Sequence, residues 1–269
     1  MKRKDALPSD MPEPAATPAP AIEFRDAGYI IPAQEPRIIL DGISLRIANG
    51  EVVAVLGRSG SGKTSLLKLI NRILRFTSGD VLVGGKSVSS WDLIQLRRGI
   101  GYVIQETGLF PHLTVRKNVC LVPDLENWPK DRARQRFHEV MALVGLDAGE
   151  FAPRYPRELS GGQRQRVGVA RALAADPRVL LMDEPFGALD PITRAELQQV
   201  FLDLSRRVRK TIVLVTHDLR EALLLGTRVV LLNAGHVVAS ASPDDFLRLD
   251  HSAVREFIAA SELRVRQTV

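Results

Sequence analysis

The chain has a single cysteine, few aromatic residues and no long apolar run. Because Cys120 is alone among 269 residues, no internal disulfide can form, and a reducing compartment is expected. Aromatic residues make up only 5%, which disfavours the stacking platforms of many nucleic-acid-binding proteins. Apolar runs are short, as at 179–182 and 222–225, whereas roughly 20 residues are needed to cross a bilayer. If the protein serves a membrane process, we expect another chain to supply the pore.

The N-terminal segment is rich in proline and alanine. Residues 1–21 contain no apolar core of the length that a signal peptide needs, so we expect a disordered tail and no secretion. The net charge of +6 is compatible with attraction to nucleic acid or anionic lipid, but the basic residues are scattered along the chain. A solvated surface with an anion-binding site is the favoured interpretation, and no nucleic-acid partner is expected.

From Ile22 onward, apolar runs of strand length alternate with helical patterns. This alternation predicts an α/β fold with a parallel sheet covered on both faces. The clearest helix begins at Asp190, an N-cap residue followed by a proline at the first helical position. Its apolar residues recur on one face, at Leu197, Val200, Phe201, Leu204 and Val208. The other predicted helices span 63–71 and 130–147, and the predicted strands span 51–56, 101–104, 178–182, 211–215 and 228–232.

A glycine-rich loop connects the first of these strands to helix 63–71. Residues 57–64 read G-R-S-G-S-G-K-T and match the phosphate-loop pattern G-x-x-x-x-G-K-[ST] in its required strand–loop–helix context. Backbone N–H groups there can point at phosphate oxygens, Lys63 can reach the β- and γ-phosphates, and the Thr64 hydroxyl can bind Mg²⁺. Nucleotide binding is therefore predicted for Gly57, Arg58, Ser59, Gly60, Ser61, Gly62, Lys63, Thr64 and Ser65.

An acidic pair follows the strand predicted at 178–182. Asp183 would hold Mg²⁺, directly or through water, and Glu184 would face the attacking water as general base or as the group that orients it. Two acids at a strand end can also be an ordinary surface pair, but a phosphate loop in the same chain favours the catalytic interpretation.

A second anion-binding helix start is encoded at 159–163, which read L-S-G-G-Q. Ser160 is an N-cap candidate, and the two following glycines leave backbone N–H groups uncovered. Together with the loop and the acidic pair, this pentapeptide resembles the signature motif of the ATP-binding-cassette (ABC) ATPases. The resemblance covers 22–245. It implies ATP and Mg²⁺ as ligands, ATP hydrolysis, and a head-to-tail homodimer in which each signature, Ser160, Gly161, Gly162 and Gln163, closes on the ATP held by the other copy.

The resemblance also implies an architecture. A P-loop NTPase cassette of this family has a parallel-sheet core, an N-terminal antiparallel β subdomain and an inserted α-helical subdomain, here at about 106–165. The cassette would occupy 22–245, and 246–269 would form a short helical tail.

Further residues match the family by position. Gln105 resembles the glutamine that contacts Mg²⁺ and senses the γ-phosphate, and His217 resembles the switch histidine at the γ-phosphate. Catalytic roles are therefore implied for Glu184, His217 and Gln105. Asp190 resembles the aspartate at the dimer seam.

Two assignments concern metal and adenine. The resemblance implies Thr64, Gln105 and Asp183 as the groups around Mg²⁺. Tyr29 is the candidate for stacking on adenine, and Phe24 is the alternative, although Phe24 is also a natural strand core residue.

Residues 96–115 and 180–194 look like the ATPase subunits of bacterial osmoprotectant importers, which take up glycine betaine, choline or carnitine. This implies a peripheral subunit on the cytoplasmic face of the inner membrane, bound to permease subunits and served indirectly by a periplasmic or lipid-anchored solute-binding protein. Segment 106–120, with Phe110 and Leu113, would receive the permease or simply pack as core. The alternatives are another solute importer, an exporter, and a soluble ABC ATPase outside transport.

Overall fold

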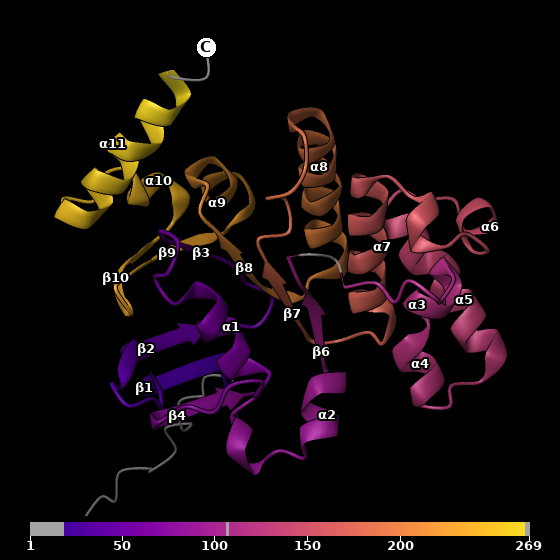
Figure 1. Ribbon diagram of the computed structural model, residues 1–269, viewed down its shortest axis with the longest axis horizontal. Helices are drawn as coiled ribbons and strands as arrows, with labels where there is room; N and C mark the ends of the chain where they lie inside the picture. Colours follow the sequence, from indigo (N-terminus) through magenta and orange to yellow (C-terminus); the bar gives the residue numbers. More distant parts are fainter. Residues whose placement is uncertain (1–18, 106–107, 267–269) are drawn as a thin grey trace, which may run out of the picture.

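The computed structural model describes residues 19–105 and 108–266, so most of the expected tail lies outside the described residues (Figure 1). A six-stranded sheet forms the centre, with the order β10-β9-β3-β8-β7-β6. Neighbours from β9 to β6 are parallel, and β10 pairs antiparallel at one edge. The strands span Val52–Leu56 (β3), Ile100–Val103 (β6), Val179–Asp183 (β7), Thr211–Thr216 (β8), Arg228–Asn233 (β9) and His236–Ala241 (β10).

The predicted parallel core is confirmed, and its physical cause is the run of valines and leucines in the central strands. Every residue of β3, β7 and β8 is buried. Such two-faced burial requires cover on both sides of the sheet. One of these faces packs in a cluster with the N-terminal sheet and helix α1 (Lys63–Ile70), and the other packs in a cluster with helices α5 (Lys130–Leu143), α7 (Gly161–Ala174) and α8 (Pro191–Val208).

A second, antiparallel sheet has the order β2-β1-β4-β5. Ile22, Phe24 and Ile43 face its core and are at most 2% exposed. The last residues of the expected tail contact this region, because the Ala21 carbonyl accepts a hydrogen bond from the N–H of Gly84 at 2.9 Å. The strands span Ile22–Ile31 (β1), Arg37–Ile47 (β2), Ser78–Val83 (β4) and Lys86–Ser87 (β5).

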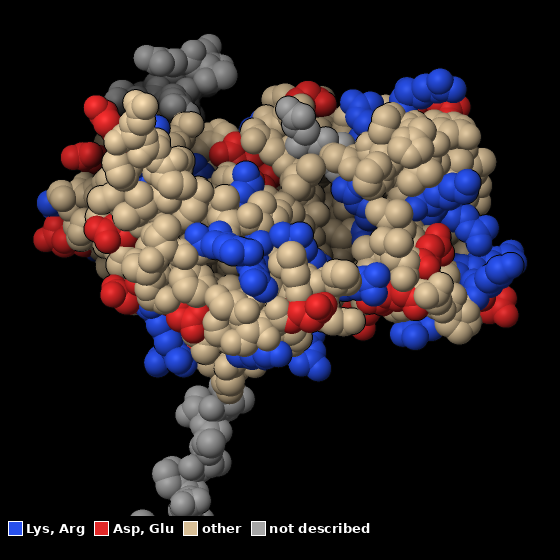
Figure 2. Space-filling view, turned by 60° about the horizontal axis from the view of Figure 1, so that its bottom comes forward, with Lys and Arg blue, Asp and Glu red and all other residues tan. Residues whose placement is uncertain are grey.

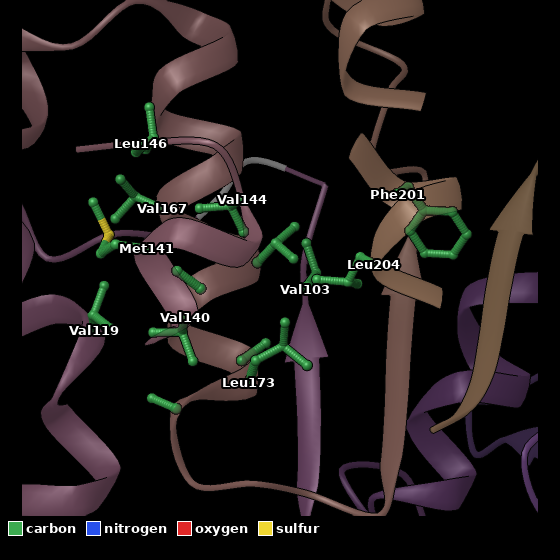
Figure 3. Close-up of a cluster of buried hydrophobic side chains, with 14 of the residues drawn as sticks. Val103, Val119, Val140, Met141, Val144, Leu146, Val167, Leu173, Phe201 and Leu204 are labelled. Carbon is green, nitrogen blue, oxygen red and sulfur yellow. The ribbon is translucent and has the colours of Figure 1, made fainter. Parts of the chain in front are cut away.

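Short helices form a lobe beside β6 (Figure 1). Its core is continuous with that of the central sheet: Met141 and Val144 from the lobe, Val167 and Leu173 of α7, and Phe201 of α8 belong to one buried cluster (Figure 3). The remaining helices span Leu93–Arg98 (α2), Val115–Val119 (α3), Leu121–Leu125 (α4), Ala148–Phe151 (α6), Leu219–Leu225 (α9), Pro243–Phe246 (α10) and Ser252–Arg266 (α11), with 3₁₀ turns at Val88–Ser90 and Pro156–Glu158.

The predicted helix start at Asp190 is confirmed. Its side chain accepts hydrogen bonds from the N–H groups of Ile192 and Thr193 at 3.2 and 3.1 Å. Leu197, Phe201 and Leu204 are buried, as the periodicity of the sequence predicts. In contrast, the helix predicted over 130–147 ends at Leu143, because the backbone turns into the left-handed region at Gly145.

Charged side chains are interspersed over the face drawn in Figure 2, and Lys and Arg are more frequent on the side of the helical lobe. Within the described residues, no helix combines the length and apolar character that crossing a bilayer demands.

Candidate nucleotide site

The carboxyl ends of β3, β8 and β7 meet at one edge of the central sheet. The register pairs Leu56 with Thr216 and Asp183 with Val215, so the three strands end level with one another. In open α/β sheets such an edge is where ligands bind. The phosphate loop, His217 and Glu184 therefore emerge side by side.

Lys63 anchors the loop in its curled form. Its Nζ donates hydrogen bonds to the carbonyl oxygens of Gly57 and Arg58 at 2.9 and 3.0 Å, and lies 3.9 Å from a carboxylate oxygen of Glu184. The side chain is 5% exposed, and this burial lowers the pKa of Lys63, against the opposing effect of Glu184 and Asp183. Within the described residues the one ion pair of this buried cation, with Glu184, is long, so Lys63 is suited to an anionic ligand.

Two glycines of the loop have left-handed backbones but differ in the space around them. Gly60 has φ +79°, and a Cβ added there would meet nothing within 4 Å. Gly62 has φ +102°, and a Cβ there would lie 2.7 Å from a methyl carbon of Leu40 and 2.9 Å from the carbonyl oxygen of Ile39. Gly62 is thus required by both conformation and space.

Asp183 joins the acidic strand end to the loop. Its Oδ1 accepts a hydrogen bond from Thr64 Oγ1 at 2.9 Å, and Oδ2 accepts one from the Tyr102 hydroxyl at 3.4 Å. Burial raises the pKa of Asp183, the hydrogen bond from Thr64 lowers it, and the neighbouring Glu184 raises it further. Burial also raises the pKa of Tyr102, which keeps its hydroxyl a donor.

Glu184 and His217 face each other. The Nδ1 atom of His217 lies 3.2 Å from Oε2 of Glu184. Glu184 has φ +44°, an uncommon backbone for a non-glycine residue, and its N–H donates to the carbonyl of Val215 at 3.0 Å. Such conformations cluster at functional sites, where the surrounding structure fixes them. The pair is also accessible, since His217 is 47% and Glu184 21% exposed.

The signature segment builds the start of α7. Ser160 Oγ accepts from the N–H of Gln163 at 3.2 Å, and Gln163 Oε1 accepts from the N–H of Ser160 at 2.9 Å, a reciprocal capping box. The N-cap prediction for Ser160 is thereby confirmed. Among the described residues, no hydrogen bond or ion pair joins this segment to the phosphate loop of the same chain.

Comparison with known proteins agrees with this geometry. Residues 40–187 match the family model described as ABC transporter. The chain belongs to the ABC transporter family. Its fold is that of the solved ABC cassettes. A dimeric, post-hydrolysis cassette bound to ADP and Pi superposes with TM-score 0.74 at 33% identity, covering 82% of this chain and 98% of that one. CbiO1 of Clostridium perfringens, part of an ABC transporter complex, gives TM-score 0.78 at 28% identity, with 93% and 97% covered.

Several curated relatives of this ABC protein are import ATP-binding proteins. The osmoprotectant import protein OsmV of Salmonella typhimurium is 51% identical, over 79% of this chain and 56% of its own length. The glycine betaine/carnitine/choline transport protein OpuCA of Bacillus subtilis is 49% identical, over 83% and 59%. The glycine betaine uptake protein YehX of Escherichia coli is 47% identical, over 91% and 79%. The chain thus spans less than two thirds of the first two relatives.

The remaining predicted residues take different places in the cassette. Gln105 is exposed just beyond the end of β6, the neighbour of β7, and in the part of the chain that the structure describes no hydrogen bond joins it to Asp183. Tyr29 is half-buried on β1, whereas Phe24 is 2% exposed in the core of the same strand, so its ring has no face open to a base. Asp190 is exposed at the cap of α8.

The structure adds polar residues that the motifs do not contain. Tyr102 contacts Asp183, and Thr216 and Glu221 form a buried hydrogen bond of 2.6 Å beside His217. One signal for Glu221 exists in the sequence, since an acid at position 221 falls on the same helical face as Ala222 and Leu225, which are apolar.

The two loop glycines give a matched pair of substitutions. Gly62→Ala is expected to destabilise the protein more than Gly60→Ala and to abolish nucleotide binding, because its Cβ collides with Leu40 and with backbone. Gly60→Ala should cost only the left-handed backbone, about 1–2 kcal/mol. Urea unfolding and titration with a fluorescent ATP analogue measure both effects. Equal losses for the two variants would contradict this account of the loop.

Proposed function

We propose that the protein binds ATP in the phosphate loop and hydrolyses it with Glu184 as general base. The observation that carries this is the convergence of the Lys63 amine, the Glu184 carboxylate and the His217 imidazole within 3.9 Å contacts at one sheet edge. Water attacks the γ-phosphorus while Glu184 accepts its proton, and the bond from the γ-phosphorus to the bridging oxygen breaks to release ADP and phosphate. The positive charge of Lys63 would neutralise negative charge on the phosphates. His217 would bind the γ-phosphate and orient it beside Glu184.

The residues present fit Mg²⁺. The hydroxyl of Thr64 and the carboxylate of Asp183 supply hard oxygen ligands 2.9 Å apart. Gln105, exposed just beyond the next strand, would add an amide oxygen. Magnesium is usually held by one or two carboxylates together with substrate phosphates. When bound, the ion neutralises phosphate charge, and Tyr29 would cover the adenine.

We further propose that two chains enclose two ATP molecules. The signature residues Ser160, Gly161, Gly162 and Gln163 start helix α7, where Ser160 and Gly161 are exposed and Gly162 is buried. Such a helix start can bind a phosphate, and Asp190 lies at an exposed cap. In the proposed dimer, this phosphate belongs to the ATP bound in the phosphate loop of the second copy. The solved cassettes described as dimeric support this arrangement.

Glu184→Gln separates binding from turnover. This variant should lose at least about a hundredfold in phosphate release because no base accepts the proton of the water. It should still bind MgATP and accumulate as a dimer with two nucleotides. Phosphate release and light scattering on a sizing column check both results.

A control variant tests the dimer. A Cβ at exposed Gly161 meets nothing closer than 3.8 Å, so Gly161→Arg fits the single chain but would obstruct a partner. In the Glu184→Gln background it should keep ATP binding and remain monomeric. Near-normal turnover by Glu184→Gln would contradict the catalytic assignment, and an MgATP dimer that tolerates Gly161→Arg would contradict the sandwich.

The proposed role of this hydrolysis is to energise import of a small solute, in the class of glycine betaine, choline or carnitine. Relatives at 47–51% identity named for uptake of such compounds support the solute class. The protein would lie at the cytoplasmic face of the inner membrane, bound to permease subunits, and a solute-binding protein would deliver the solute from outside. The ATPase itself would not contact the solute.

The permease would dock near Phe110. Phe110 is 42% exposed, and its ring packs edge-on against His112. The backbone around it is held by Asn118, which is fully buried. The Asn118 amide donates to the carbonyls of Phe110, Leu113 and Thr114 at 3.0–3.1 Å. An exposed aromatic on a fixed backbone is suited to a partner's helix.

Uptake measurements test the transport role. Cells that lack the gene should lose uptake of radiolabelled glycine betaine or choline. Wild type should restore uptake, and Lys63→Ala should not, because the phosphate loop loses its only lysine. Unchanged uptake of both compounds on deletion would overturn the proposed solute class.

A further inference from the structure

A carboxylate that belongs to none of the ATP-site motifs is buried beside the loop that carries His217. Glu221, in the first turn of α9, is 5% exposed. Its Oε2 accepts from Thr216 Oγ1 at 2.6 Å, and its Oε1 accepts from Gln198 Nε2 at 3.2 Å. Burial raises the pKa of this carboxyl, although the hydrogen bond from Thr216 opposes that rise. Burying such a group is costly unless both oxygens are satisfied, as they are here.

Thr216 transmits this anchor to the backbone around His217. The residue ends β8 and is 1% exposed. While its hydroxyl donates to Glu221, the same oxygen accepts from the N–H of Asp218 at 3.0 Å. Asp218 in turn caps α9 by accepting from the N–H groups of Arg220 and Glu221 at 2.8 and 3.4 Å. The chain is therefore fixed on both sides of His217.

The cluster also reaches α8. Gln198 comes from that helix, and so does Arg194, whose charge acts on Glu221. A small cavity of about 20 Å³ is enclosed by this cluster and the catalytic pair, and its lining includes Glu184, Arg194, Thr216, His217 and Glu221. The cap of α8 is Asp190, so one rigid helix joins the proposed dimer seam to the anchor of His217.

We propose that Thr216 and Glu221 are positioning residues that hold His217 against Glu184, and that Gln198 ties this position to α8. The proposal rests on the ATPase function proposed above. Within the described residues, no hydrogen bond or ion pair joins the side chain of Thr216 or Glu221 to the phosphate loop. Their effect is geometric, since a misplacement of about 1 Å in a catalytic group costs roughly a hundredfold in rate.

Thr216→Val tests the proposal, because it fills the same space and removes both hydrogen bonds of the hydroxyl. We expect kcat for ATP to fall between about tenfold and a hundredfold, with KM within about threefold. Thr216→Ser should restore most of the rate, since it keeps the hydroxyl. Gln199→Ala, on an exposed position of the same helix α8, should equal wild type. An unchanged kcat for Thr216→Val would overturn the proposal.

A double-mutant cycle with His217→Ala separates positioning from general destabilisation. If Thr216 acts through His217, adding Thr216→Val to His217→Ala should cost no further rate in single-turnover assays. The proposal would be overturned if the double variant lost rate, relative to His217→Ala, by the same factor as Thr216→Val loses relative to wild type. It would also be overturned if Thr216→Val weakened ATP binding by as large a factor as it lowers kcat. Absence of hydrolysis by the wild-type dimer would instead overturn the proposed ATPase function.

Discussion

One hydrogen bond, from Thr64 Oγ1 to Asp183 Oδ1, links the two halves of the nucleotide site. Asp183 is the last residue of β7, and Thr64 lies in the first turn of α1, after the loop that follows β3. Strands β3 and β7 are not neighbours, because β8 lies between them. The bond therefore depends on the parallel register of three buried strands. Lys63 precedes Thr64 and Glu184 follows Asp183, so the same bond brings the Lys63 amine to 3.9 Å from one carboxylate oxygen of Glu184. His217, just after β8, lies 3.2 Å from the other oxygen of Glu184.

Burial makes the charged forms of two groups at this edge of the sheet less favourable. Burial lowers the pKa of Lys63 and raises that of Asp183, so both groups are less stable as ions than they would be in water. The left-handed backbone of Glu184 is a further unfavourable contribution at this edge. Under the proposed function, a phosphate and a hard cation would offset these costs, and preorganised charge of this kind is what phosphoryl transfer requires. The large apolar core supplies the stability that allows the strain.

Much of this architecture could be predicted from the sequence. Unbroken valine and leucine runs indicate the parallel strands, Asp190 and Ser160 cap their helices as expected, and the motif order implies the family. The anchor of Thr216 by Glu221 and Gln198 could not be predicted, because the bond from Gln198 to Glu221 joins α8 to α9 across 23 positions of chain. The end of α5 at Leu143 was missed because a glycine overrides an otherwise helical pattern.

The most direct test of the central claim is the affinity of the site for a divalent cation. Mn²⁺, a paramagnetic substitute for Mg²⁺, can be titrated by electron paramagnetic resonance in the presence of a non-hydrolysable ATP analogue. Asp183→Asn keeps the oxygen that Thr64 contacts and removes the charge. The account predicts cation binding weakened at least about tenfold, with nucleotide binding through Lys63 retained. Equal Mn²⁺ affinity in wild type and variant would contradict it.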